Sequence, residues 1–334
     1  MDEEKIKQID KSSYVTDLEE FPHHIMEGFE LPEKIKVDKK SIDKIVIAGM
    51  GGSAMPGDIL ETYMRYNSKV PVIVTRNYKL PALADKNTLV FTLSYSGNTE
   101  ETIECFREAL RKGCQIVSIT SGGKIKELAT LHKKPLVIVP GNKQPRAMVG
   151  YVFFSMLRML MSYGLIRNVR KDVEALSEYL KTSVFKEKAQ ELAKNLLDKI
   201  PLIYASDDFG PVATRFKTQI NENAKIHAFW NTFPEMNHNE IVGYTELYGK
   251  YHMVIFGSDS DHPRTKKRFE ICKKLVKSKG VTVTQMNFSG NSLLKQMFTA
   301  IHMGDWTSYY MAVYKGVDPS PVEIIENLKK ELKR

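Results

Sequence analysis

An alternation of short apolar runs with helical segments is the feature that most constrains the fold of this chain. The first half carries five runs of four to six residues, rich in Val, Ile and Leu, and helical spacing follows several of them. These predicted strands are 44–48, 70–74, 88–93, 115–119 and 136–139. Short buried strands alternating with helices are typical of a parallel sheet covered on both faces. The pattern therefore predicts an α/β fold that is doubly wound.

The second half repeats this order of elements in a weaker form. Its predicted strands are 201–205, 251–256 and 281–286, and its predicted helices are 212–225, 264–279 and 292–313. The last of these helices resembles the long apolar segment 147–163 of the first half. A repeat of elements fixes the architecture because each copy buries its own core. We predict two similar α/β domains, residues 1–168 and 169–334, with a linker near 169–178.

Composition narrows the class of protein. Of the 334 residues, 42% are hydrophobic and 27% charged, which is ordinary for a globular protein. No run approaches the roughly 20 apolar residues of a membrane span, and the charged N-terminal segment lacks the apolar core of a signal peptide. We expect no membrane partner. Cys105, Cys114 and Cys272 form no CxxC pair, which favours a reducing, cytoplasmic location.

The chain is basic, with a formal net charge of +9 and a pI near 9.1. Such a charge suits an anionic partner, whether a sugar phosphate, a nucleotide, a nucleic acid or a membrane surface. The basic residues are dispersed, however, and clusters such as 266–268 and 329–330 lie on helical patterns that also carry acids. That arrangement is typical of a solvated helix face. We therefore expect no nucleic-acid partner.

Two strand-to-helix loops of the first half are rich in glycine and hydroxyl groups. GMGGSA at 49–54 follows the first predicted strand, and SYSGNTEE at 94–101 follows the third. In open α/β sheets, ligands lie beyond the carboxyl ends of strands, where helix N-termini direct their N–H groups. Glycine lets the backbone approach an anion, hydroxyls add donors, and the helix dipole favours negative charge. Together the loops predict a cradle for a phosphate group.

Each loop alone has a simpler explanation. GMGGSA could be an ordinary tight turn, and it fails as a dinucleotide fingerprint because Ala54 stands where the last glycine is needed. In SYSGNTEE, Asn98 or Thr99 followed by two acids is good helix-cap chemistry. Capping does not require Ser94 and Ser96 as well. Two such loops after neighbouring strands favour the phosphate interpretation.

A second distinctive stretch, between 219 and 240, gathers Asn, Glu and His side chains around an aromatic pair and a proline. Glu222 is a candidate general base, since partial desolvation among amides and aromatics can tune a carboxylate. The alternative is a helix-surface acid paired with Lys225. His238 is a second candidate, or else a turn histidine bonded to backbone. No His, Cys or Asp cluster has metal-ligand spacing, so a mechanism without metal or cofactor is expected.

Several stretches together carry a resemblance to a known family. They are GMGGSAMPGD at 49–58, SYSGNTEET at 94–102, Pro145-Arg146, NENAK at 221–225, FPEMNHNEIVG at 233–243 and the terminal Pro321-Val322-x-x-Ile-x-x-Leu-Lys329. In this combination the chain resembles the bifunctional phosphoglucose/phosphomannose isomerases, in the SIS-domain (sugar isomerase) branch of the phosphoglucose isomerase superfamily. The stretches span nearly the whole chain. The resemblance implies two SIS-like domains.

The resemblance also implies an activity, the interconversion of glucose 6-phosphate and mannose 6-phosphate with fructose 6-phosphate through a cis-enediolate. Glu222 matches the base that moves the proton between C1 and C2. Arg146 matches the cation that stabilises enediolate charge, which suits a side chain that is always protonated. His238 and Lys329 match the ring-opening pair, although Lys330 adjoins Lys329 and leaves that register open. The implied phosphate and sugar contacts are Gly52, Ser53, Ser94, Ser96 and Thr99.

Further implications concern assembly and metabolism. In the family the histidine reaches the site across a dimer interface, so a homodimer is expected, with a place in glycolysis and gluconeogenesis. The loop GSDSDHPRT at 257–265 lacks the SxSGxT pattern and is acidic, so one phosphate site per chain is expected. Two alternatives stay open: a SIS isomerase for another phosphosugar, and a SIS module that senses a sugar phosphate without turnover. Fold alone does not separate them.

Overall fold

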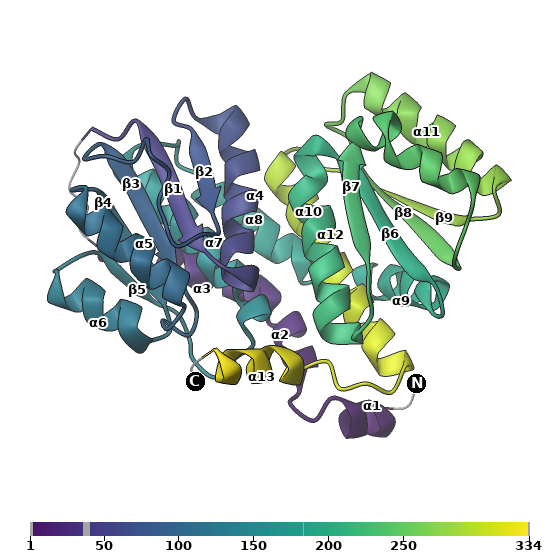
Figure 1. Cartoon of the computed structure of the whole chain (residues 1–334), viewed down its shortest axis with the longest axis horizontal. Helices are drawn as coiled ribbons and strands as arrows, with labels where there is room; N and C mark the ends of the chain where they lie inside the picture. The colour runs from purple at the N-terminus through teal and green to yellow at the C-terminus, as the bar shows by residue number, and fades with distance from the viewer. Residues whose placement is uncertain (1–2, 36–40, 183, 333–334) are drawn as a thin grey trace. The chain divides into compact units, whose positions relative to one another are not determined.

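The computed structural model describes residues 3–35, 41–182 and 184–332, and it divides into two compact units (Figure 1). The N-terminal unit comprises Glu20–Lys181. The C-terminal unit comprises the residues up to Glu19 together with those from Thr182 onward. Each unit is built around its own parallel sheet.

The sheet of the N-terminal unit has the strand order β2-β1-β3-β4-β5, with all pairs parallel. Its strands are β1 (Lys44–Gly49), β2 (Val72–Thr75), β3 (Thr88–Leu93), β4 (Gln115–Thr120) and β5 (Leu136–Ile138). All five were predicted within about two residues. β3 is buried along its whole length, as expected for a central strand covered on both faces.

Helices cover both faces of this sheet. They are α3 (Phe21–Glu30), α4 (Gly51–Asn67), α5 (Glu100–Arg111), α6 (Gly123–Leu131), α7 (Val149–Tyr163) and α8 (Arg170–Leu180), with a 3-10 turn η1 (Pro145–Met148). Phe106 of α5 and Ile125 of α6 pack with Val46, Val90 and Ile116 of the strands in one core cluster. α7 packs against α3 and α4. The apolar stripe of α7 is core, as its Met and aromatic composition predicts.

The predicted linker near 169–178 is a helix, so this prediction is wrong. α8 buries apolar side chains at helical spacing on one face: Val173, Leu176 and Leu180. Ser177 Oγ donates to the carbonyl oxygen of Pro22 at 2.7 Å, which ties α8 to α3. The polar composition of the segment hid a short amphipathic pattern of period 3.6.

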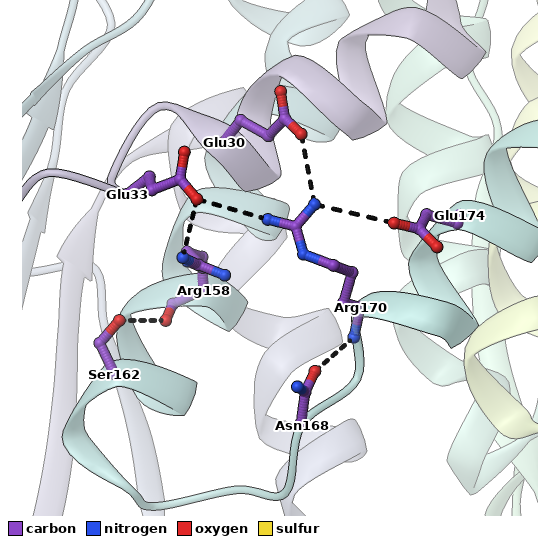
Figure 2. Close-up of polar contacts among 7 residues, drawn as sticks. All are labelled: Glu30, Glu33, Arg158, Ser162, Asn168, Arg170 and Glu174. Carbon is purple, nitrogen blue, oxygen red and sulfur yellow. Dashed lines mark hydrogen bonds and ion pairs between the residues drawn. The ribbon is translucent and has the colours of Figure 1, made fainter.

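Charged side chains reinforce the packing of α8 in the N-terminal unit (Figure 2). The Arg170 guanidinium lies 3.3, 3.7 and 3.7 Å from the carboxylates of Glu30, Glu33 and Glu174. Arg158 also reaches Glu33, at 3.4 Å. Both guanidinium groups lie 5.3–5.4 Å from the ring of the buried Phe29, within cation–π distance. The segment that leaves α7 therefore belongs structurally to the N-terminal unit.

The sheet of the C-terminal unit has the order β7-β6-β8-β9, again all parallel. Its strands are β6 (Ile200–Ser206), β7 (Phe229–Phe233), β8 (Tyr251–Ser258) and β9 (Thr282–Phe288). This is the order of the first four strands of the other sheet. The predicted fold class, two doubly wound domains with parallel sheets flanked by helices, is confirmed.

The remaining elements belong to this unit. Its α-helices are α1 (Glu3–Ile9), α2 (Tyr14–Glu19), α9 (Val184–Leu196), α10 (Gly210–Gln219), α11 (Pro263–Ser278), α12 (Leu293–Tyr314) and α13 (Glu323–Glu331). Its short turns are η2 (Asp207–Phe209), the π turn η3 (Ile220–Ala224), η4 (Glu235–His238) and η5 (Glu240–Thr245). α12 is almost wholly buried and forms the centre of the unit.

Two features of this unit differ from the sequence prediction. β7 was missed, because its sequence FWNTF has polar residues at its centre and two exposed aromatics, Phe229 and Trp230, at its start. It is an edge strand, which needs less apolar surface. The second feature is α2, which packs against α12 and buries Tyr14 and Leu18. The compact units thus divide after Glu19 and Lys181, whereas the predicted segments divide after residue 168.

No helix in the described part of the chain is long and apolar enough to cross a membrane.

Candidate active site

The two predicted phosphate loops lie at the switch point of the N-terminal sheet. β1 and β3 are neighbours, and Gly49 and Leu93, their last residues, are paired in register. From β1 the chain runs to β2 on one side, and from β3 it runs to β4 on the other. Right-handed crossovers then place α4 and α5 on opposite faces of the sheet. The crevice that this reversal leaves outside the strand ends is where α/β sheets bind ligands.

Both helices that begin in this crevice lack a capping side chain. The N-cap positions are Met50 for α4 and Thr99 for α5, and neither side chain makes a capping hydrogen bond. Thr99 begins the helix as predicted, but the predicted cap bond is absent. Its Oγ1 lies 2.8 Å from Ser94 Oγ instead. The first N–H groups of α4 and α5 therefore receive no side-chain cap, and an anion can serve as their acceptor.

Glycine is required at two positions for the β3–α5 loop to pack closely against the β4–α6 loop. Gly97 has φ +72°, and a Cβ there would lie 1.8 Å from the carbonyl oxygen of Gly122. Gly123 has φ +66°, and its Cβ would lie 2.3 Å from the carbonyl oxygen of Ser96. Asn98 Oδ1 accepts the N–H of Lys124 at 3.0 Å. The β3–α5 loop is thus built against the β4–α6 loop, and Asn98 serves this packing.

Contacts also connect the β1–α4 loop to the other site residues of this unit. Ser53 Oγ accepts the N–H of Tyr95 at 3.2 Å. A Cβ on Gly52 would lie 3.2 Å from Cα of Arg146, so glycine allows α4 to begin directly against η1. The structure therefore brings the N-terminus of α4, the β3–α5 loop and η1 together.

Arg146 is 2% exposed, and its Nη1 donates to Gln144 Oε1 at 3.1 Å. Tyr95 was not singled out by sequence reasoning, yet its hydroxyl accepts the N–H of Lys143 at 2.8 Å and so braces the segment before Arg146. Ser96 is exposed, and its Oγ accepts the N–H of Asn98 at 3.3 Å. Four hydroxyl side chains, glycine backbone and one buried guanidinium thus form a set suited to an anionic sugar phosphate.

In the C-terminal unit, Glu222 lies in the π turn that continues α10. π turns inserted in helices are frequent at functional sites. The motif amides bind backbone and core: Asn221 Nδ2 donates to the Ile226 carbonyl at 2.7 Å, and Asn223 Nδ2 donates to Ser308 Oγ at 2.9 Å. Lys225 Nζ donates to the carbonyl oxygen of Glu222. The turn is thus held by hydrogen bonds from Asn221, Asn223 and Lys225. Glu222 lies in the same turn, and it is half-buried.

The residues on both sides of His238 are likewise held in place by hydrogen bonds. Asn237 accepts a hydrogen bond from Arg268, and Asn239 Oδ1 accepts the N–H of Glu240 at 2.5 Å. The Glu240 carboxylate accepts from the Tyr204 hydroxyl at 2.5 Å and from Asn231 at 2.6 Å. Burial raises the pKa of Tyr204, which keeps that hydroxyl a donor.

His238, between these anchors, is exposed. Its neighbours on both sides fix the turn, whereas the imidazole itself is directed to solvent. That exposure suits a group that exchanges protons with a ligand.

Lys329 lies on α13, a helix without buried residues in the described part of the chain. Both Lys329 and Lys330 are exposed. The fold of the C-terminal unit therefore does not distinguish between them. Glu222, His238 and Lys329 belong to one unit, and the phosphate loops and Arg146 belong to the other.

At the switch point of the second sheet, between β6 and β8, the loop that follows β8 is bonded to the chain's own groups. The N–H of Ser258 donates to Asp261 Oδ2 at 2.7 Å, and Ser260 Oγ donates to Gln296 Oε1 at 3.1 Å. His262 Nδ1 caps α11 by accepting the N–H of Arg264 at 3.1 Å. Burial raises the pKa of Asp261. A buried carboxyl group and a capped helix make this loop a poor place for a second anion.

Two adjacent histidines, His23 and His24, lie at the start of the N-terminal unit, and one of them would be expected on the surface of the helix. His23 is exposed, whereas His24 is buried and its ring lies 4.7 Å from that of Tyr151. His24 Nε2 is 3.6 Å from a carboxylate oxygen of Glu20.

Comparison with known proteins agrees with this architecture. The family model described as SIS domain matches residues 40–163, and the model described as bacterial phospho-glucose isomerase C-terminal SIS domain matches residues 185–332. A solved structure, a hypothetical protein of Thermus thermophilus, has a TM-score of 0.77 at 15% identity, covering 98% of this chain and 94% of that one. The protein is therefore built of two SIS domains.

Two relatives show to which family of SIS-domain proteins the chain belongs. A bifunctional phosphoglucose/phosphomannose isomerase of Caldicellulosiruptor bescii is 41% identical, covering 93% of this chain and 96% of that protein. The protein of the same name from Aquifex aeolicus is 36% identical, covering 93% and 98%. The chain belongs to the bifunctional phosphoglucose/phosphomannose isomerase family, and the resemblance stated from the motifs is confirmed.

Proposed function

We propose that the protein interconverts glucose 6-phosphate and mannose 6-phosphate with fructose 6-phosphate through a cis-enediolate, without a metal or cofactor. The observation that carries the proposal is family membership combined with the full set of motif residues in this chain. A sensing module would need the hydroxyl-rich loops but not Glu222, Arg146, His238 and Lys329 together. The other catalytic possibility is isomerisation of a different phosphosugar, and an activity assay distinguishes the two.

The proposed binding contacts are in the N-terminal unit. Ser53, Ser94, Ser96 and Thr99 hold the phosphate and sugar, and Gly52 supplies its backbone N–H. The uncapped starts of α4 and α5 support this assignment, since helix N-termini favour anions. The filled loop at the second switch point supports one phosphate per chain.

The proposed chemistry begins with ring opening. His238 and Lys329 exchange protons with the ring oxygen and the C1 hydroxyl. Glu222 then takes the proton from one of C1 and C2 and returns it to the other, which requires a carboxylate held close to a weakly acidic carbon-bound proton. Arg146, always protonated, stabilises the negative charge of the enediolate. A base that returns the proton it removed leaves the enzyme unchanged after each turnover.

We propose that the active form is a homodimer in which each chain contributes His238 across the interface. The exposure of His238 supports this, and so do exposed apolar side chains of the same unit: Phe229, Trp230, Val242 and Tyr248. Exposed aromatics are enriched at protein interfaces.

The proposed setting is the cytoplasm, in glycolysis and gluconeogenesis. The location is supported by three cysteines that are free and buried rather than paired in disulfides. A reducing compartment leaves such thiols unoxidised.

The test of the function is an assay of purified protein with fructose 6-phosphate in the presence of EDTA, with glucose 6-phosphate and mannose 6-phosphate measured separately. We expect both products to form. Loss of activity in EDTA that zinc restores would contradict the metal-free mechanism. Absence of both products would favour another phosphosugar or a sensing role, and binding of fructose 6-phosphate without turnover would identify the sensor.

The ring-opening lysine can be identified by a matched pair of variants. Lys329→Met should lower kcat for glucose 6-phosphate more than about tenfold, because it removes a proton donor. Lys330→Met should leave kcat unchanged. Neither should alter stability, since both side chains are exposed on α13. A larger effect at Lys330 would move the role to that residue, and wild-type rates in both variants would contradict a lysine role.

A further inference from the structure

We propose that a buried relay of Asn223, Ser308 and Asp305 positions Glu222 for proton transfer by fixing the π turn that carries it. The inference rests on the proposed role of Glu222 as the base. It concerns residues that do not touch the substrate and act through the turn.

The relay begins at the residue next to Glu222. Asn223 Nδ2 donates to Ser308 Oγ at 2.9 Å, and Ser308 Oγ donates to the backbone carbonyl of Asp305 at 2.8 Å. Both side chains are 0% exposed. One hydroxyl is thus both acceptor and donor, so it connects the π turn to the backbone of α12. α10 and α12 lie side by side in the same unit (Figure 1).

The far end of the relay is a buried ion pair. Arg215 donates to Asp305 from Nε at 3.0 Å and from Nη2 at 2.7 Å. Gln219 Nε2 adds a third bond to the same carboxylate, at 3.0 Å. Each of these three residues is at most 3% exposed. Arg215 and Gln219 lie on α10, so the ion pair fixes α10 on α12 just before the π turn begins. Bidentate pairs of this kind restrict geometry strongly.

The turn is also held on its other side. Lys225, in the left-handed conformation with φ +58°, ends the helix. Its Nζ donates to the carbonyl oxygens of Glu222 and of Pro319, the latter at 3.0 Å. Glu222 thus lies between a buried amide bonded to α12 and a lysine bonded to the chain that precedes α13.

The direction of the Glu222 side chain depends on the π register. An α-helix advances about 100° per residue, so the extra residue of a π turn rotates every side chain after it by about one such step. Returning to α-helical register would withdraw the Asn223 amide from Ser308 and leave both buried groups without these partners. The relay therefore stabilises the π register and sets the direction in which Glu222 points.

The experiment compares Ser308→Ala with Thr307→Val. Thr307 is the adjacent residue on α12, is also 0% exposed, and bonds along its own helix, to the Met303 carbonyl at 2.8 Å. We expect Ser308→Ala to lower kcat for fructose 6-phosphate about 10- to 100-fold, the range expected for a small displacement of a reacting group. The KM should stay within about twofold.

Solvent exchange gives a readout that a structural role would not change. In D2O, a displaced Glu222 should lose its captured proton to solvent more often, so deuterium incorporation per turnover should rise in Ser308→Ala. Thr307→Val should lower the Tm and leave kcat and exchange unchanged. If Ser308→Ala does not fold, Asn223→Ala tests the same bond from the other side.

The outcomes separate the two levels of the proposal. Wild-type protein without isomerase activity would overturn the proposed function. A Glu222→Gln variant that keeps wild-type turnover would overturn the assignment of Glu222 as the base, on which the positioning role rests. An active wild type whose Ser308→Ala variant keeps kcat within twofold, or whose Thr307→Val variant loses kcat equally, would overturn the positioning role alone.

Discussion

Replacing Glu222 by Gln is expected to lower kcat about 1,000-fold or more, because a positioned general base contributes roughly 10²–10⁴-fold to proton transfer. The amide is nearly isosteric with the carboxylate but does not accept the carbon-bound proton. Binding of fructose 6-phosphate should survive, since the proposed phosphate contacts are on other residues. Isotope exchange at C1 and C2 should be lost together with turnover.

The matched control is Glu270→Gln, which removes a carboxylate on α11 that pairs with Lys273 at 2.7 Å. It should leave kcat unchanged, since Glu270 has no place in the proposed mechanism. Calorimetric titration with fructose 6-phosphate measures binding in each variant. Wild-type turnover in Glu222→Gln would show that another residue is the base. Loss of binding together with turnover would instead mean that the substitution disturbs the site as a whole.

The second large effect is expected for Gly97→Ala, which should destabilise the protein by about 4 kcal/mol or more, in the range that signals a severe steric conflict. The added Cβ would lie 1.8 Å from the Gly122 carbonyl oxygen and 2.7 Å from its carbon. Both contacts are with backbone, so no side-chain rotation relieves them. The loop must open, and the Ser94 and Thr99 hydroxyls would separate. Protein that remains folded should show a KM raised more than tenfold.

Gly113→Ala provides the control for backbone conformation. Gly113 has φ +69°, close to that of Gly97, but its Cβ would meet only Lys86 Cβ, at 3.9 Å. Gly113→Ala should lower the free energy of unfolding by about 1–2 kcal/mol, which is the strain of an alanine in the left-handed conformation. The KM should stay unchanged. Denaturant unfolding measures both variants. Equal destabilisation would contradict the steric argument, and an unchanged KM in a folded Gly97→Ala variant would contradict a binding role for the loop.

Much of the fold could be predicted because its strands are short and strongly apolar. β1, β3 and β4 are buried along nearly their whole length, so apolar and β-branched residues predominate in their sequences. β7 could not be predicted in this way, because an edge strand with exposed aromatics lacks that signal. α8 was hidden by its polar composition, since only every third or fourth residue is buried.

For the candidate site, residue chemistry predicted which side chains to examine but not their local geometry. The hydroxyls of the β3–α5 loop follow from the sequence, yet the pairing of Thr99 with Ser94, in place of a helix cap, depends on the loop's three-dimensional closure. The π turn at Glu222 has no signature in the sequence, because it is selected by contacts with α12, far along the chain. The catalytic roles of these residues stay predictions.

The shared strand order of the two sheets has a consequence for where the chain should tolerate substitution. In the first sheet the switch-point loops leave helix starts uncapped, whereas in the second the corresponding loop satisfies itself through Asp261, Gln296 and His262. The loop after β8 therefore uses its own polar groups where the loops of the first sheet leave helix starts uncapped. If the proposed binding contacts hold, substitutions in the 257–265 loop should change substrate affinity less than substitutions in the 94–99 loop.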